Sequence, residues 1–329
     1  MLYKYLTLLL NIPLLLIGFF LLNRSAGFFV DGASSIARKI KLPESMISFT
    51  IVALGASLPK LFTNILAVMN GYDDLVIGNV IGSNIFNLLG IIGIVGLYRP
   101  IRANRYTLFI GIPFSILSVV LLYLLSNNIL FGTKSIVLGL SNFDGYILLI
   151  GFIGFMTYGY FNVKKHNAIW FEESHQKIEH YAIWFAVLMF IIGLIGLYAG
   201  AILVVDNLID ISRKYHLSQR FLGQFVLALG GSFTMLWWTL NFKTHQSKFE
   251  VSSLIGTNVL NIFGMLGVCA VIAPMAYNTS FNIDIYILIA ISILLMLFLW
   301  TGKKLNLSLA KCRFLVLLLI VYMVYLFVR

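Results

Sequence analysis

Two stretches of the chain place hydroxyl and amide side chains inside otherwise apolar sequence. The first covers residues 41–93 and the second covers residues 216–267. Their motifs are, in chain order, ALGASLPK (53–60), GNVIGSNIFN (78–87), ALGGSFTM (228–235) and SSLIGTNVLN (252–261). Glycine and proline in a membrane helix free backbone carbonyls, and such backbone is tolerated only where protein or a cavity satisfies it. Carbonyl, hydroxyl and amide oxygens are ligands for hard cations such as sodium or calcium. The pattern therefore predicts a cation-binding centre.

The two stretches align with each other, so the candidate ligands occur in pairs. The pairs are Ser57 with Ser232, Ser83 with Thr257, and Asn87 with Asn261. Small polar residues at such spacings also allow close helix packing and interhelical hydrogen bonds without any ligand. The recurrence of the whole pattern in both halves favours the site interpretation, because internal repeats of this kind are typical of transporters.

The composition indicates a membrane protein with many helices. Hydrophobic residues make up 60% of the 329 residues and charged residues only 11%. Apolar runs long enough to cross a bilayer, about 18 residues or more, recur along the chain and predict ten spans. These are residues 6–31, 43–70, 74–97, 105–126, 139–162, 180–206, 217–242, 249–273, 282–301 and 310–328. We expect an all-α membrane protein.

The positions of the two repeats predict how the ten helices are arranged. The matching motifs begin in spans two and seven, which are an odd number of spans apart, so the copies cross the membrane in opposite directions. We therefore expect two inverted five-helix repeats, residues 1–162 and 180–329, joined by a short cytoplasmic linker, 163–179. Gly55 to Pro59 should split span two, and Gly230-Gly231 should loosen span seven.

The charged residues indicate topology rather than a polyanionic partner. The net charge is +11, but the basic residues lie in short loops between apolar runs, so nucleic acid is excluded as a partner. Most of them follow the odd-numbered spans, among them Arg38, Lys39, Arg99, Lys303 and Lys304. The positive-inside rule then places both termini on the non-cytoplasmic side, in a cell inner membrane. No cofactor motif and no nucleophile paired with a base is present, so an enzyme is not expected.

The motifs resemble those of the sodium/calcium exchanger superfamily, the cation/calcium antiporters. Members are ten-span proteins with two inverted repeats of the type ALGTSLPE followed by GNxxGSNxxN. The likeness covers nearly the whole chain, and the first repeat matches more closely than the second. The resemblance implies cation exchange by alternating access, with an inorganic ion or small solute as substrate. The positions that match the family's ligands are Ala53, Ser57, Ser83, Asn87, Ala228, Ser232, Thr257 and Asn261.

This sequence departs from the family at the two glutamates that neutralise the transported ion. Lys60 and Met235 stand at those positions. The formal charge of the centre thereby changes from about −2 to about +1, and each pair of unit charges about 4 Å apart contributes about 4 kcal/mol at an effective dielectric near 20. We therefore expect no metal at the central site and no ordinary sodium/calcium exchange.

Lys60 lies well inside span two, where an ionisable side chain is costly and is a functional candidate by default. Three interpretations stay open. The ammonium replaces the bound cation; or it gains and loses a proton during transport, because burial disfavours its charge; or it attracts an anion together with a helix N-terminus. The sequence therefore predicts an ion antiporter with an altered centre. The alternatives are a proton-coupled, anion or other-solute transporter that uses Lys60, and a transport-inactive sensor or scaffold. The sequence does not give the oligomeric state.

Overall fold

A computed structural model describes residues 2–42, 47, 51, 55, 57–99, 101, 103–130, 138–166, 181–241, 251–302 and 305–329. Within these ranges the chain is helical apart from connecting turns and two strands of two residues each. It divides into two compact units, which are described separately. The first unit comprises Met1–Ala67 and Phe171–Ser218, and the second comprises Val68–Trp170 and Gln219–Arg329. Each unit therefore combines segments from both halves of the sequence.

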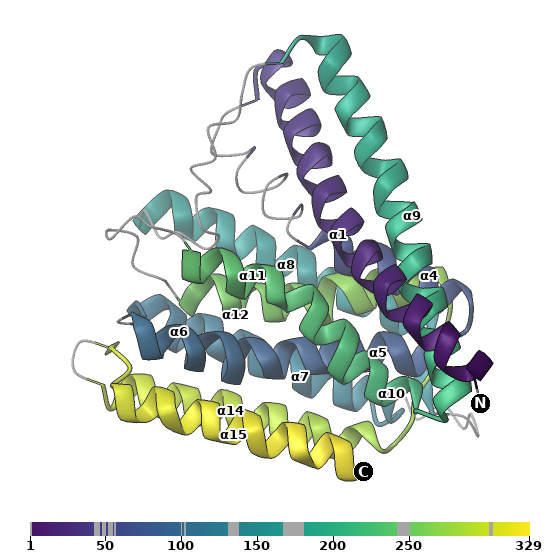
Figure 1. Ribbon diagram of the computed structural model, residues 1–329. Coiled ribbons are helices and arrows are strands. Elements are labelled where there is room, and N and C mark those ends of the chain that lie inside the picture. The colour runs from purple at the N-terminus through teal and green to yellow at the C-terminus, as the bar shows by residue number, and fades with distance from the viewer. Residues whose placement is uncertain are drawn as a thin grey trace. The chain divides into compact units, whose positions relative to one another are not determined.

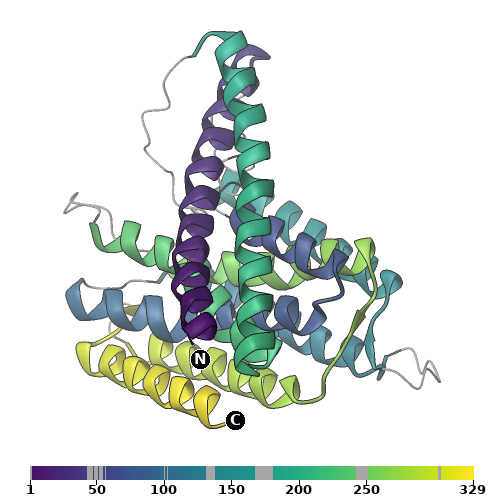
Figure 2. The same ribbon diagram turned by 45° about the vertical axis from the view of Figure 1, so that its right-hand side comes forward.

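Two long helices, α1 (Leu2–Lys39) and α9 (Ile183–Tyr215), form most of the first unit and lie side by side (Figures 1 and 2). They contain 38 and 33 residues. At about 1.5 Å per residue they are roughly 57 and 50 Å long, longer than a hydrocarbon core of about 30 Å. The predicted ends at residues 31 and 206 were too early, because an apolar run marks the bilayer crossing whereas the helix continues through polar residues that favour helix.

Glycines bring the backbones of α1 and α9 into direct contact. A β-carbon added at Gly32 would lie 2.6 Å from the carbonyl oxygen of Ala186, and one added at Gly193 would lie 2.6 Å from the backbone nitrogen of Phe29. Gly18 lies against Val204 in the same way. Low residue numbers of α1 thus meet high numbers of α9, so the pair is antiparallel. Small residues permit this close approach in membrane helices, where packing replaces hydrophobic burial as the driving force.

The third helix of this unit, α4 (Leu58–Met69), begins inside the predicted interruption of span two. Gly55 is helical, Ser57 is in a turn and Leu58 starts a new helix with Pro59 in its first turn, where the missing N–H of proline costs nothing. The helix ends at Met69, before the turn Asn70–Tyr72, in which Gly71 has a φ of +73°. The short connection between spans two and three, which the span limits 70 and 74 predict, is therefore confirmed.

The second unit contains the remaining helices and a two-stranded ribbon. Its elements are α5 (Asp73–Phe86), η2 (Asn87–Ile91), α6 (Ile92–Tyr98), η3 (Thr107–Gly111), α7 (Ile112–Ser126), β1 (Gly139–Leu140), α8 (Asn142–His166), α10 (Gln219–Leu222), η4 (Gly223–Leu227), α11 (Ala228–Asn241), α12 (Val251–Val259), η5 (Leu260–Leu266), α13 (Gly267–Ile272), β2 (Met275–Ala276), α14 (Phe281–Trp300) and α15 (Leu309–Val328). The segments named η are π-helical. Strands β1 and β2 pair antiparallel, Gly139 opposite Ala276.

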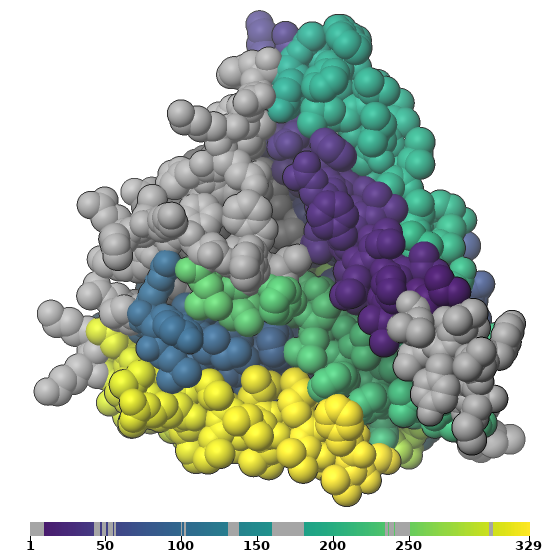
Figure 3. All heavy atoms as spheres, in the orientation of Figure 1, coloured from purple at the N-terminus to yellow at the C-terminus, as the bar shows by residue number. Residues whose placement is uncertain are grey.

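Helices α5 and α12 form the core of the second unit. Every residue of α5 from Leu75 to Phe86 is buried, and so are all of η2 and η5. The outer layer seen in Figure 3 is α14 and α15, whose exposed side chains include Trp300 and Phe327. Their apolar outward faces are typical of helices that contact lipid. The polar residues of the motifs are thus held at the centre of this unit.

The described part of the chain contains one helical segment in each of the ten predicted ranges. Seven of the helices are long and apolar enough to cross a membrane, by length and composition. The start of the fifth span was placed wrongly at 139, because Gly139 and Leu140 are the strand β1 and the helix begins at Asn142. The predicted effect of Gly230-Gly231 is also wrong. Helix α11 continues through both glycines, and the irregular segment is η4, one turn earlier. Glycine only weakens a helix that packing supports.

The contact between α1 and α9 predicts which glycines cannot be enlarged. Gly32→Val and Gly193→Val should each destabilise the protein by about 1–3 kcal/mol, because the added side chain meets backbone that cannot move aside. Gly27→Val is the matched control, since a β-carbon at Gly27 has no neighbour within 4 Å. Thermal unfolding of the purified protein in detergent measures the effect. Equal melting temperatures for all three variants would contradict the backbone contact.

Candidate amide centre

The centre of the second unit is built where two helices change from α-helical to π-helical geometry. Asn87 is the first residue of η2, directly after α5, and Asn261 is the second residue of η5, directly after α12. The two residues correspond to each other in the internal repeat. π-Helical turns inside helices occur frequently at functional sites, because the wider turn redirects side chains and loosens backbone bonding. Both repeats therefore carry the same irregularity at the same motif position.

Four asparagines connect the two repeats at this point. Asn84 Nδ2 donates to the Asn258 carbonyl oxygen at 3.1 Å, and Asn258 Nδ2 donates to the Asn84 carbonyl oxygen at 3.3 Å. Asn87 Nδ2 donates to Asn258 Oδ1 at 2.8 Å, and Asn261 Nδ2 donates to Asn84 Oδ1 at 2.7 Å. Each bond has a counterpart with the repeats exchanged. We call these four residues the amide tetrad.

The hydrogen bonds of the tetrad determine which side-chain atom of Asn87 and of Asn261 has no hydrogen-bond partner. All four side chains are fully buried. Because Asn87 and Asn261 use their amide nitrogens to hold the opposite repeat, their Oδ1 atoms are left without a hydrogen-bond partner. A buried carbonyl oxygen without a partner is costly and is the kind of atom that a hard cation accepts as a ligand. The two oxygens come from equivalent positions of the repeats.

The predicted hydroxyl ligands lie on the same two helices. Ser83 Oγ donates to Asn79 Oδ1 at 3.3 Å, and Thr257 Oγ1 donates to the Ser253 carbonyl oxygen at 2.9 Å. Ser83 is buried and Thr257 is partly exposed. In both cases the hydroxyl proton points along its own helix, and the oxygen retains lone pairs that a cation can use.

Helix α11 brings two further predicted positions to the second unit. A β-carbon added at Gly82 would lie 3.0 Å from the β-carbon of Ala228 and 2.6 Å from the carbonyl oxygen of Gln224, so α5 packs directly on η4 and the start of α11. Ala228 and Ser232 are both buried. Met235 is within α11, and its side chain lies outside the described residues.

The other predicted positions belong to the first unit. Ser57 and Lys60 are buried, each with 8% of its surface exposed. Thr63 Oγ1 donates to the Lys60 carbonyl oxygen at 2.9 Å and to that of Pro59 at 3.0 Å, which stabilises the first turns of α4. Ala53 lies outside the described residues. The structure thus brings Ser83, Asn87, Ala228, Ser232, Thr257 and Asn261 into one unit, and Ser57 and Lys60 into the other.

Sequence reasoning missed Asn84 and Asn258 as members of the site. The signal was present, because Gly82-Ser83-Asn84 aligns with Gly256-Thr257-Asn258 in the internal repeat. An asparagine that occupies the same place in both copies, beside a candidate ion-binding residue, is expected to orient that residue even where it does not bind the ion itself.

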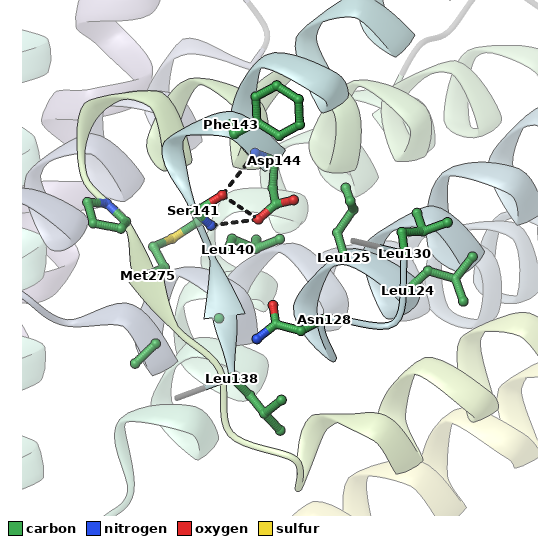
Figure 4. Close-up of a pocket in the computed structure, with 13 residues that line it drawn as sticks. Leu124, Leu125, Asn128, Leu130, Leu138, Leu140, Ser141, Phe143, Asp144 and Met275 are labelled. Atoms are coloured by element: carbon green, nitrogen blue, oxygen red, sulfur yellow. Dashed lines mark hydrogen bonds between the residues drawn. The ribbon is translucent and has the colours of Figure 1, made fainter. Parts of the chain in front are cut away.

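A cavity of about 630 Å³ is built by other elements, the end of α7, the start of α8 and the ribbon β1–β2. Its walls are mainly apolar, with five leucines, and Asp144 is the charged residue (Figure 4). Asp144 Oδ2 accepts from the Ser141 backbone nitrogen at 2.8 Å and from Ser141 Oγ at 2.7 Å, which caps the first turn of α8. This carboxylate therefore has a structural role.

Inverted helical repeats that meet at buried polar groups define a membrane transporter. The chain belongs to the sodium/calcium exchanger protein family, whose sequence model matches residues 10–161 and 185–328. It is 31% identical to CaxA of Alkalimonas amylolytica, which is named as an antiporter. The 263 aligned residues cover 79% of this chain and 80% of that protein. The inner membrane protein YrbG of Escherichia coli is 26% identical over 290 residues, covering 85% of this chain and 86% of that protein.

A solved structure of the sodium-calcium exchanger NCX_Mj, soaked with 2.5 mM Na⁺ and 1 mM Sr²⁺, matches with a TM-score of 0.59 and 27% identity. The match covers 96% of this chain and 98% of that one. The predicted family and the fold of ten helices in two inverted repeats are therefore confirmed. The chain is an integral membrane protein with the fold of cation/calcium antiporters, a family of ion transporters rather than of enzymes.

The reciprocal bonds of the tetrad predict a specific energetic coupling. Asn84→Ala and Asn261→Ala should each destabilise the protein by about 1–3 kcal/mol, because each leaves a buried partner unsatisfied. In a double-mutant cycle the pair should show a coupling of about 0.5–3 kcal/mol, since the two side chains are bonded directly.

The mirror pair Asn258→Ala with Asn87→Ala should give a similar coupling. Asn23→Ala is the control, because Asn23 Nδ2 bonds only to the Phe19 carbonyl oxygen within its own helix. Denaturant titration in detergent measures all of these energies. Additive effects in both cycles would contradict the tetrad.

Proposed function

We propose that the chain is a secondary antiporter that moves a monovalent cation through a centre of neutral oxygens. The observation that supports this proposal is the pair of buried, unpartnered oxygens on Asn87 and Asn261, which the tetrad holds in place. Sodium is the first candidate, because it is a hard cation of single charge. The relatives CaxA and NCX_Mj are named as an antiporter and a sodium-calcium exchanger, which supports cation exchange as the activity.

The same proposal excludes ordinary sodium/calcium exchange. In the family motif Lys60 and Met235 occupy the places of the two glutamates that balance a divalent ion. Neutral oxygens stabilise a single charge more easily than a double charge, and divalent affinity in proteins follows the number of charged ligands. Two lost attractions of about 4 kcal/mol each correspond to a loss of about a thousandfold in affinity per carboxylate.

Flux into proteoliposomes tests this proposal. The unmodified protein should exchange radioactive sodium and should not accumulate calcium above protein-free vesicles. The variant with Lys60→Glu and Met235→Glu should gain calcium uptake, because it restores both carboxylates. The variant with Lys60→Gln and Met235→Gln is the matched control, with similar volume and no charge, and should not gain it.

Two results would count against the proposal. Calcium accumulation by the unmodified protein would refute the charge argument. Absence of flux for every ion tested, in the unmodified protein and in all variants, would favour a transport-inactive sensor or scaffold. The expected location is a cell inner membrane, as in the name of the relative YrbG, with both termini on the non-cytoplasmic side.

The burial of Lys60 supports a second candidate function. An amine with 8% of its surface exposed inside a membrane segment is a candidate proton carrier or anion partner. If Lys60 carries a proton, the flux should depend on pH, and this dependence should disappear in Lys60→Ala. As an anion partner, it requires chloride or phosphate uptake that Lys60→Ala abolishes. Sodium flux with an unchanged pH dependence in Lys60→Ala would contradict both roles.

A further inference from the structure

A second buried ionic group lies in the second unit, outside the amide tetrad. The acidic and basic side chains that are buried in the described part of the chain are Lys60, Asp144 and Asp284. Asp144 caps α8. Asp284 lies in the first turn of α14, has no exposed surface, and belongs to a segment that is apolar enough to span a membrane. An ionisable residue inside a span is a functional candidate, with its partner as part of the hypothesis.

Helix α15 supplies the first set of partners. Tyr322 Oη donates to Asp284 Oδ1 at 3.3 Å, and Arg329 Nη1 lies 3.3 Å from Asp284 Oδ2. Arg329 also donates to Tyr325 Oη and to the Ser280 carbonyl oxygen. The Arg329 side chain exposes 19% of its surface, whereas Asp284 exposes none. The arginine therefore connects the buried carboxylate with the outside of the unit.

The opposite side of Asp284 faces the helix that carries the predicted site. The side chain of Gln224, in η4, faces the carboxylate, although its Oε1 and Nε2 make no hydrogen bond within the described part of the chain. Arg220, one turn earlier in α10, interacts with the carboxylate electrostatically. Gln224 is buried, and its backbone is the contact of Gly82 in α5. Gly82 precedes Ser83 and Asn84 directly. A continuous set of packed residues thus leads from Asp284 to the tetrad.

The charge state of Asp284 changes the net charge of a group of ionisable side chains at this end of the unit. Arg220 also interacts with Asp74 at the start of α5 and with Arg329. Tyr277, before α14, interacts with Asp284 and with Tyr123 of α7. Asp73 interacts with Asp74, so this end of the unit holds three carboxylates and two arginines. When Asp284 takes up a proton, this group gains one positive charge, which disfavours a cation bound in the same unit.

We propose that Asp284 is a proton-binding site whose occupation opposes cation binding at the amide tetrad. The proposal rests on the proposed cation function and adds its counter-ion, a proton. The proton binds to a carboxylate oxygen of Asp284 and leaves as the cation binds, so charge is exchanged one for one. Gln224 and the segment η4 transmit the change, since they contact both Asp284 and the helix of the tetrad.

Infrared spectroscopy of the full chain in lipid membranes tests the proton site without any transport. A pH change between 9 and 5 should produce a carboxylic acid band that shifts with ¹³C-labelled aspartate and is lost in Asp284→Asn. Asp144→Asn is the matched control, another buried aspartate at a helix start, and should keep the band. An Asp284 that stays ionised over this range would overturn the proposal.

Sodium binding tests the coupling. Thermal stabilisation by sodium chloride should weaken as the pH falls, up to about tenfold in apparent affinity per pH unit for one coupled proton. The dependence should be lost in Asp284→Asn and kept in Lys60→Ala. The charge exchange Asp284→Arg with Arg329→Asp should recover thermal stability without recovering the pH dependence. Recovery of both, or sodium binding independent of pH, would show a structural ion pair and overturn the proposal.

The two proposals can fail separately. If sodium does not bind at any pH although Asp284 titrates, the proposed cation function is refuted. The coupling between the proton and the cation is then overturned as well. With sodium flux and no titrating carboxylic acid at Asp284, the cation function stands and the proton site is refuted.

Discussion

The structure of the second unit depends on one interaction, the reciprocal hydrogen bonding between Asn84 and Asn258. Each side chain donates to the main chain of the other helix, and each accepts the amide of an outer asparagine from the opposite repeat. This arrangement requires that α5 and α12 contact each other over their polar residues, fully buried. Because the amide nitrogens of Asn87 and Asn261 donate to the opposite repeat, the orientation of these two side chains is fixed, and their Oδ1 atoms are left for a ligand.

The chemistry of the centre follows from what the tetrad does not contain. Amide oxygens provide partial negative charge at fixed positions, but no full charge. The resemblance to the family places carboxylates at the two motif positions where this chain has Lys60 and Met235. We therefore propose that the frame is retained while its charge is changed. Asp284 places a carboxyl group at the end of the same unit, on α14, which packs against α5 and η2.

Much of the fold could be predicted from the sequence, because apolar run length and internal repetition report directly on membrane crossing and on symmetry. The ten segments and the short connection between residues 70 and 74 followed from these signals. Helix ends did not, since α1 and α9 continue through polar sequence beyond the bilayer-length run. Glycine position was also a poor guide to irregular backbone. Gly230-Gly231 remain helical, whereas η4 begins at Gly223, where α5 approaches most closely. The hydrogen bonds of Asn84 depend on which helix packs against it, and a local sequence pattern does not predict that helix.

The most direct test of the account is calorimetric titration of the purified protein with sodium and with calcium, repeated for Asn87→Ala with Asn261→Ala. The unmodified protein should bind sodium, the double variant should not, and neither protein should bind calcium. Calcium binding by the unmodified protein that the double variant abolishes would contradict it, because neutral amide oxygens would then hold a divalent ion without the carboxylates.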